Sequence, residues 1–150
     1  MKYILLMLLL VGCNITKDLS FIVTEIPDLE IETPKEAAKW ISKNIKYQAD
    51  GEQNNWKAPQ RTYFEGYGDC EDFTTLWMYL VEEQTEYTDT YFIGGEWLDK
   101  PGTYHAYGWH NDLYYEPQAG WYGKEYLWAT DILKYSYKTV MLLAVIKEIK

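Results

Sequence analysis

The hydrophobic periodicity of the chain changes once, near Thr88, and this change limits the folds that it can adopt. Before that point apolar residues recur every three or four positions in two segments. After it, short runs rich in aromatic and β-branched residues are separated by Gly, Pro, Asn and Asp. The first pattern is typical of amphipathic helices, and the second of β-strands joined by turns. Helices first and strands after favour an α+β domain with an antiparallel sheet.

The expected elements begin and end at recognisable residues. The segment Thr33-Pro34-Lys35-Glu36 supplies an N-cap, a proline at the first helical position and a capping-box acid, so we expect a helix over roughly 34–46. A loop is expected over 50–62, because that segment has no periodicity, and a second helix is expected to begin near Asp69. Strands are expected over 90–93, 104–109, 113–115 and 139–146.

Length and charge exclude several classes of protein. A chain of 150 residues is long enough for one domain with a real core. The formal net charge of -9 argues against a nucleic-acid partner, because phosphate backbones are bound by surplus Lys and Arg. The 7 Trp and 15 Tyr fit a tightly packed domain or a binding surface, and composition alone does not separate the two.

The first residues carry a targeting pattern. Residues 4–11 are uninterruptedly apolar but too short to cross a hydrocarbon layer of ~30 Å, which is typical of a signal-peptide core. The segment Leu10-Val11-Gly12-Cys13 resembles the lipobox of bacterial lipoproteins, which implies a lipid on Cys13 and an exported chain anchored to a bacterial membrane. An ordinary secretory signal with a chance cysteine is the alternative. The expected organisation is a signal peptide (1–12), a lipidated N-terminus and tether (13–33) and a folded domain (34–150).

The segment Gly66–Phe73 places Cys70 in the first turn of the second expected helix. Free backbone N–H groups and the helix dipole at that end favour a thiolate, the nucleophilic form of cysteine. Glu71 and Asp72 act in the opposite direction, because nearby negative charge raises a thiol pKa. A histidine close enough to take the thiol proton is therefore needed.

The two histidines of the chain are His105 and His110. A two-residue hairpin turn that begins at His110 would place His105 opposite Glu116, on the same face of the sheet. A carboxylate beside an imidazole fixes its tautomer and stabilises the charged ring. A shift of the turn by one residue would pair Glu116 with Tyr107 instead. Asp112 is the other candidate for the acidic position.

These residues, in this order, resemble the transglutaminase-like superfamily, and the closest subgroup is the bacterial transglutaminase-like cysteine peptidases. The similarity consists of Cys70 in G-D-C-E-D-F, His105 in Y-H-A-Y and Glu116 in Y-Y-E-P, within a region from about 33 to 116. It implies a papain-like core in which the cysteine-bearing helix packs on a sheet that carries histidine and acid. It also implies a thioester on the cysteine, and an oxyanion held by the indole N–H of Trp56. The usual acid is aspartate, and the histidine is commonly followed by Ala-Trp, so this chain departs at both positions.

No cofactor is expected from the sequence. Some relatives of this peptidase subgroup bind calcium with acids beside the cysteine, which makes Asp69, Glu71 and Asp72 candidate ligands here. Calcium prefers six to eight oxygens, so three carboxylates in one turn are too few without other loops.

The expected function is that of a membrane-tethered cysteine peptidase or amidase with a Cys-His-Glu triad, acting on protein or peptide outside the cytoplasm. A transamidase would use the same thioester and differ only in whether an amine or water arrives second. A hydrolase of cell-wall peptides would share the mechanism and differ in substrate. A non-catalytic, surface-binding lipoprotein on the same scaffold is the alternative from a different class.

Overall fold

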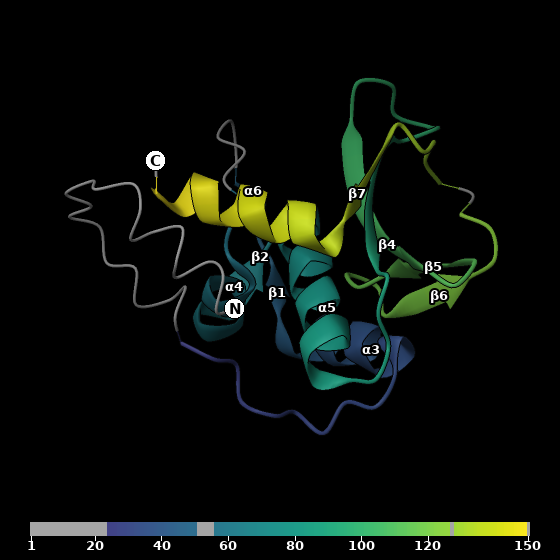
Figure 1. The fold of residues 1–150 in the computed structure, drawn as a ribbon. Coiled ribbons are helices and arrows are strands. Elements are labelled where there is room, and N and C mark those ends of the chain that lie inside the picture. Colours follow the sequence, from purple (N-terminus) through teal and green to yellow (C-terminus); the bar gives the residue numbers. More distant parts are fainter. Residues whose placement is uncertain (1–23, 51–55, 127, 150) are drawn as a thin grey trace.

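The computed structural model describes residues 24–50, 56–126 and 128–149. The expected signal peptide and Cys13 lie outside them. The described chain is an α+β fold in which helices pack on one side of an antiparallel sheet (Figure 1). Its helices are α3 (Pro34–Asn44), α4 (Pro59–Glu65), α5 (Cys70–Gln84) and α6 (Tyr137–Ile149).

The larger sheet has five strands in the order β6-β5-β4-β3-β7, and every neighbouring pair is antiparallel. Strand β7 follows the others in the chain and returns to pair with β3. The strands are β3 (Tyr91–Glu96), β4 (Tyr104–His110), β5 (Leu113–Glu116), β6 (Trp121–Gly123) and β7 (Leu133–Ser136). A small parallel pair, β1 (Lys46–Tyr47) and β2 (Tyr67–Gly68), lies apart from this sheet.

The two predicted helices form close to their expected limits. Helix α3 begins with a complete capping box, in which Thr33 accepts from the Glu36 N–H and the Glu36 carboxylate accepts from the Thr33 N–H. Helix α5 begins in the same way, with Asp69 as N-cap and Asp72 as the third helical residue. The nucleophile candidate Cys70 is therefore the first residue of α5.

Two expectations about secondary structure were wrong. The loop expected over 50–62 gives way at Pro59 to the short helix α4, which ends at Gly66 with φ of 73°. The strand expected over 139–146 is part of α6. Its buried residues Val140, Met141 and Ala144 follow helical spacing, whereas Leu142 is 50% exposed, so one stripe of the apolar run is covered and the rest is not.

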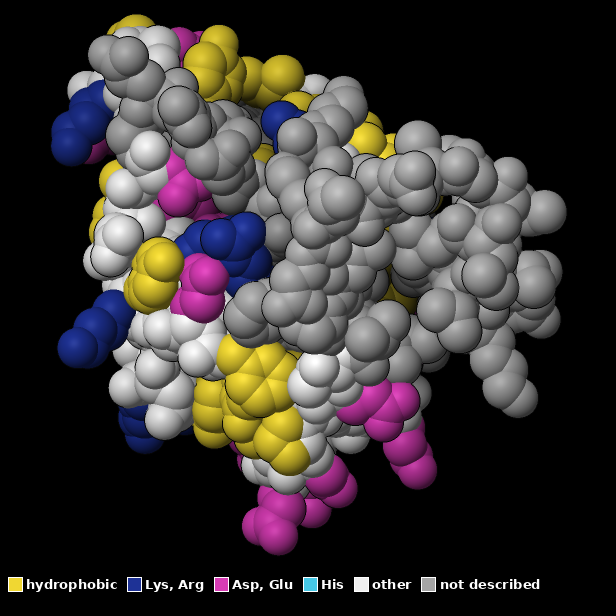
Figure 2. Space-filling view, turned by 90° about the vertical axis from the view of Figure 1, so that its left-hand side faces the viewer, with side chains coloured by type: hydrophobic (Ala, Val, Ile, Leu, Met, Phe, Trp, Pro, Cys, Tyr) yellow, Lys and Arg dark blue, Asp and Glu magenta, His cyan; other side chains and the backbone are white. Residues whose placement is uncertain are grey.

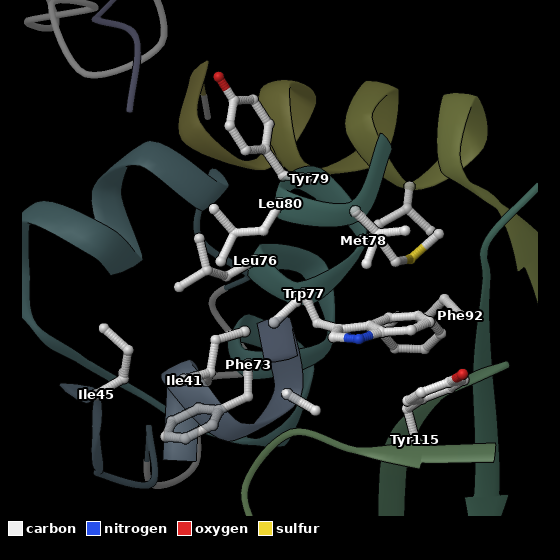
Figure 3. Close-up of a cluster of buried hydrophobic side chains, with 14 of the residues drawn as sticks. Ile41, Ile45, Phe73, Leu76, Trp77, Met78, Tyr79, Leu80, Phe92 and Tyr115 are labelled. Carbon is white, nitrogen blue, oxygen red and sulfur yellow. The ribbon is translucent and has the colours of Figure 1, made fainter. Parts of the chain in front are cut away.

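Helix α5 lies at the centre of the main core. Its buried side chains meet α3 on one side and the sheet on the other, as Figure 3 shows for Ile41, Leu76 and Trp77. The Trp77 ring stacks on Tyr115 of β5 at 4.9 Å, and its indole N–H donates to the Pro34 carbonyl at 2.9 Å. The orientation of α5 is thus fixed against both layers, which determines where its N-terminal cysteine lies.

The opposite face of the sheet is covered by a second, smaller cluster. Ile93, Tyr107, Tyr126 and Ala129 are buried together there. The segment Ala129–Ile132, here called the crossing segment, is held on β3 by N–H donors of Thr130 and Ile132 to backbone carbonyls, at 3.0 and 2.8 Å. This segment carries the chain across the sheet and on to β7.

The described part of the expected tether lies against the domain. Ile26 and Ile31 are buried in the main core, and the Gln84 side-chain amide donates to the Pro27 carbonyl at 2.9 Å. Residues 24–33 are thus packed on the end of α5, and the folded unit includes them.

Charges of both signs are interspersed among the described residues on one face of the molecule. Figure 2 shows acidic, basic and hydrophobic side chains side by side on one face, with no continuous basic patch among its described residues. No described helix is both long and apolar enough to cross a bilayer.

Candidate active site

The Cys70 thiol is free and half-buried at the N-terminus of α5. Its Sγ donates to Glu71 Oε2 at 2.9 Å. Burial raises the pKa of this thiol well above its ordinary value, and the neighbouring Glu71 carboxylate raises it further. Burial first, and the neighbouring acid second, thus act against the thiolate that a helix terminus favours.

The sulfur also meets the backbone of β4. A hydrogen bond from the Ala106 N–H lowers the pKa of the Cys70 thiol and partly opposes the effect of burial. Ala106 follows His105 directly and is buried against the helices, whereas His105 projects to the other face of the strand. The Cys70 sulfur thus meets β4 at the residue that directly follows His105.

The hairpin between β4 and β5 turns one residue later than expected. Asn111 and Asp112 are its two central residues, with φ of 48° and 59°, and His110 pairs with Leu113. A turn of this kind needs two left-handed residues, and Asn and Asp adopt that conformation more readily than His. The predicted direct pairing of His105 with Glu116 was therefore wrong.

The two side chains meet nevertheless, along the diagonal of the ladder. Beyond the pair Gly108–Tyr115, the same register places Tyr107 opposite Glu116. Because residues two apart on a strand share a face, His105 lies on the same face as Tyr107 and is a diagonal neighbour of Glu116. His105 Nε2 lies 2.5 Å from Glu116 Oε2, and both side chains are about 6% exposed. Asp112, the other acidic candidate, is exposed in the turn.

The Glu116 carboxylate is fully engaged. Its Oε2 accepts from the Tyr126 hydroxyl as well as from His105, and its Oε1 accepts from the Gln118 N–H at 3.2 Å. Neither oxygen faces the apolar surroundings without a donor, which is the condition for burying a carboxylate. The sequence did not predict this hydrogen bond from Tyr126.

Trp97 covers one face of the histidine ring. The two rings stack with centroids 4.7 Å apart. Beside them lies a cavity of about 390 Å³ whose walls are largely apolar. It is lined by Trp97, His105, Glu116, Gln118, Ala119 and Trp128. This cavity gives the His105–Glu116 pair a neighbouring space that an apolar side chain could fill.

The proposed oxyanion residue, Trp56, lies next to the start of α5. Its ring packs on Phe92 at 4.8 Å, and the Lys57 N–H that follows it donates to Asp72 Oδ1 at 2.8 Å. Lys57 is itself buried, and its ammonium pairs with Glu65 at 3.0 Å. The chain around Trp56 is thereby tied to the helix that carries Cys70.

Acidic side chains gather on the other side of this helix terminus. Within the described parts of the chain, Asp50, Asp69 and Asp72 bring one carboxylate oxygen each within 4.8 Å of one another. Burial and the charge of Glu71 raise the pKa of Asp69 to about 8, and burial raises that of Asp72 to about 6. Of the calcium ligands considered from the sequence, Asp72 accepts from the Lys57 N–H and Glu71 accepts from the Cys70 thiol.

The chemistry available here is acyl transfer. A thiol at a helix terminus lies beside a strand whose histidine is oriented by a buried carboxylate, the arrangement used for nucleophilic catalysis. With Nε2 bonded to Glu116, Nδ1 is the ring nitrogen that remains to accept a proton.

Comparison with known protein families gives a match over the first part of the chain. Residues 18–84 match the sequence profile described as the transglutaminase-like superfamily, over somewhat less than half of the chain. The match includes Trp56 and Cys70 and ends before His105 and Glu116. Neither the curated proteins nor the solved structures give a match. The matched segment and the α+β fold together support the transglutaminase-like superfamily for this chain, a family that includes cysteine peptidases and transamidases.

Proposed function

We propose that this chain is an extracytoplasmic cysteine peptidase or amidase that acts on protein or peptide substrates through a thioester on Cys70. The observation that carries the proposal is the buried contact of 2.5 Å between His105 Nε2 and Glu116 Oε2, beside a cysteine bonded to the same strand. The superfamily match over the cysteine-bearing helix supports the same chemistry.

In the proposed cycle, Nδ1 of His105 takes the thiol proton while the Cys70 sulfur attacks the carbonyl carbon of the substrate. The oxyanion that forms accepts a hydrogen bond from the indole N–H of Trp56. The C–N bond then breaks, and His105 returns its proton to the leaving amine. A water molecule deprotonated by His105 attacks the thioester, the C–S bond breaks, and the thiol is regenerated.

The raised pKa of the Cys70 thiol has a consequence for this cycle. Because burial and Glu71 raise its pKa, the proposed base acts during the attack rather than by forming a stable ion pair beforehand. The raised pKa also favours a second candidate function, a binding lipoprotein on the same scaffold that does not catalyse. The two candidates differ in whether Cys70 can be acylated with the help of His105.

The proposed location is the outer side of a bacterial membrane, with a lipid on Cys13 as anchor. The sequence Leu10-Val11-Gly12-Cys13 supports it. With a formal charge of -9, the protein has little attraction to anionic headgroups, so the anchor is the proposed means of attachment. No nucleic-acid partner is proposed.

The test is acylation of the 24–150 chain by p-nitrophenyl acetate, followed by intact-mass measurement. We expect one acetyl group on Cys70, absent in Cys70→Ser and slowed on the order of a hundredfold in His105→Ala, since general-base catalysis contributes ~10²–10⁴-fold. Adding a primary amine and analysing the released product would then separate transamidation from hydrolysis.

His110→Ala is the matched control, because His110 is the other histidine and lies at the hairpin. It should acylate like the wild type. If Cys70 is acylated equally fast with and without His105, the enzyme is excluded and the binding lipoprotein becomes the better account.

A further inference from the structure

Among the hydrogen bonds of the described chain, Glu116 accepts from the hairpin itself, from the residues directly after the hairpin, and from the Tyr126 hydroxyl. Tyr126 is therefore the donor that lies outside the hairpin region. It donates to Oε2, the same oxygen that holds His105 Nε2. Tyr126 is 8% exposed and Glu116 4%, so water has little access to this contact. A donor aimed at a buried carboxylate in this way fixes the rotation of its carboxyl group.

The ring of Tyr126 is held rigidly on the sheet. It stacks on Tyr107 of β4 with centroids 3.9 Å apart and planes 9° from parallel. Asp131, in the crossing segment, accepts from the hydroxyls of Tyr107 at 2.5 Å and Tyr114 at 2.9 Å. The chain that follows Tyr126 is therefore tied to the same two strands as His105 and Glu116, and the hydroxyl cannot easily move away.

The phenol stays protonated. Burial raises the pKa of Tyr126 far above its ordinary value, and the charge of Glu116 raises it further, with a smaller contribution from Cys70. A donor that does not ionise provides a hydrogen bond at every pH at which the site could work.

We propose that Tyr126 is a positioning residue of this site, whose hydroxyl holds Glu116 Oε2 against His105 and so orients the imidazole toward Cys70. The proposal rests on the proposed function for its effect on rate, but not for the contact itself. A glutamate has one more rotatable bond than the aspartate usual at this position, so it needs an additional anchor to be equally well ordered. Tyr126 supplies that anchor at Oε2, and the Gln118 N–H supplies a second at Oε1.

The test is Tyr126→Phe, which removes the hydroxyl and keeps the stacked ring. The first readout is the low-field proton resonance of the His105 Nε2–H in the NMR spectrum, assigned by its loss in His105→Ala. We expect it to move and to broaden through exchange with water when Glu116 is released. The second is acetylation of Cys70 across pH 4 to 9, which should slow on the order of tenfold, with a displaced pH profile, because the imidazole is less well oriented.

Tyr115→Phe is the matched control. Tyr115 is also buried and directly precedes Glu116, but it stacks on Trp77 at the opposite face of the strand, so this variant loses a tyrosine hydroxyl that does not contact the carboxylate. It should leave the resonance and the pH profile as in the wild type. An unchanged resonance in Tyr126→Phe overturns the proposal, even if acetylation slows. If the wild type is not acetylated but the resonance still moves, the proposed function fails and the positioning contact stands.

Discussion

At the scale of single residues, the length of the acidic side chain at position 116 matches the register of its hairpin. Glu116 reaches His105 along a diagonal, a longer path than that between residues directly opposite each other. An aspartate would end about one bond earlier. The methylene that separates this chain from the usual family pattern is therefore the length that this register requires.

Glu116→Asp should consequently impair the site although it conserves the charge. A displacement of ~1 Å at a catalytic group can cost on the order of a hundredfold, so acetylation of Cys70 should fall by about ten- to a hundredfold. Intact-mass kinetics would measure it, with Asp112→Ala as the control, since Asp112 is exposed in the turn. Wild-type rates in Glu116→Asp would contradict the diagonal contact as the source of the orientation.

The sequence predicted Cys70, His105 and Glu116 as one cluster, because helix-start residues and strand alternation leave a local pattern. It did not predict the contact of Tyr126 with Glu116. That contact depends on how the chain after β6 folds back over the sheet, and no spacing in the sequence encodes it. The predicted register of the hairpin was wrong for a local reason. Whether His110 or Asp112 is a turn residue depends on which of them adopts a positive φ more readily.

At the scale of elements, α5 and β4 approach each other closely at Gly108. A Cβ atom on Gly108 would lie 2.3 Å from the Trp77 ring, which is buried and cannot turn away. Cysteine and histidine are carried by these two elements, so the close packing also sets the geometry of the site.

Gly108→Ala should therefore destabilise the protein by about 1–3 kcal/mol, the usual cost of overpacking a core. Urea denaturation would measure the free energy of unfolding. Gly94→Ala is the control, because a Cβ there would meet only the flexible, partly exposed side chain of Leu133. Equal stability of the two variants would argue against a rigid contact between α5 and β4.

The helices that begin with a capping box were predictable, and the other two were not. Thr33 and Asp69 define the starts of α3 and α5. Helix α4 also has signals, Pro59 at its start and Gly66 at its end, but seven residues are too few to establish a periodicity. The run 139–146 combines β-branched ends with a Leu-Leu-Ala centre, so its residue types are compatible with a strand or a helix, and packing against α5 decides.

At the scale of the whole molecule, the acidic groups around the start of α5 link stability to pH. The pKa of Asp69 is raised to about 8, mainly by burial and then by Glu71. A carboxyl whose pKa is higher in the folded than in the unfolded chain binds more protons when folded, so its contribution makes stability fall as pH rises from about 4 to 8.

Asp69→Asn should reduce this pH dependence, because the amide keeps the N-cap acceptor and cannot ionise. Thermal unfolding at pH 5 and pH 8 would measure it: the midpoint of the wild type should drop more between the two than that of the variant. Asp99→Asn, at an exposed position, should follow the wild type. The same drop in all three proteins would exclude Asp69 as the source.

The nucleophile and its base belong to separate halves of the chain, Cys70 on α5 and His105 on β4, joined through the segment after Gln84. A partly folded chain that has formed only its helices holds an ordinary thiol with no imidazole beside it. The proposed reactivity therefore requires the sheet to be docked on α5, and a chain without that contact lacks the proposed base.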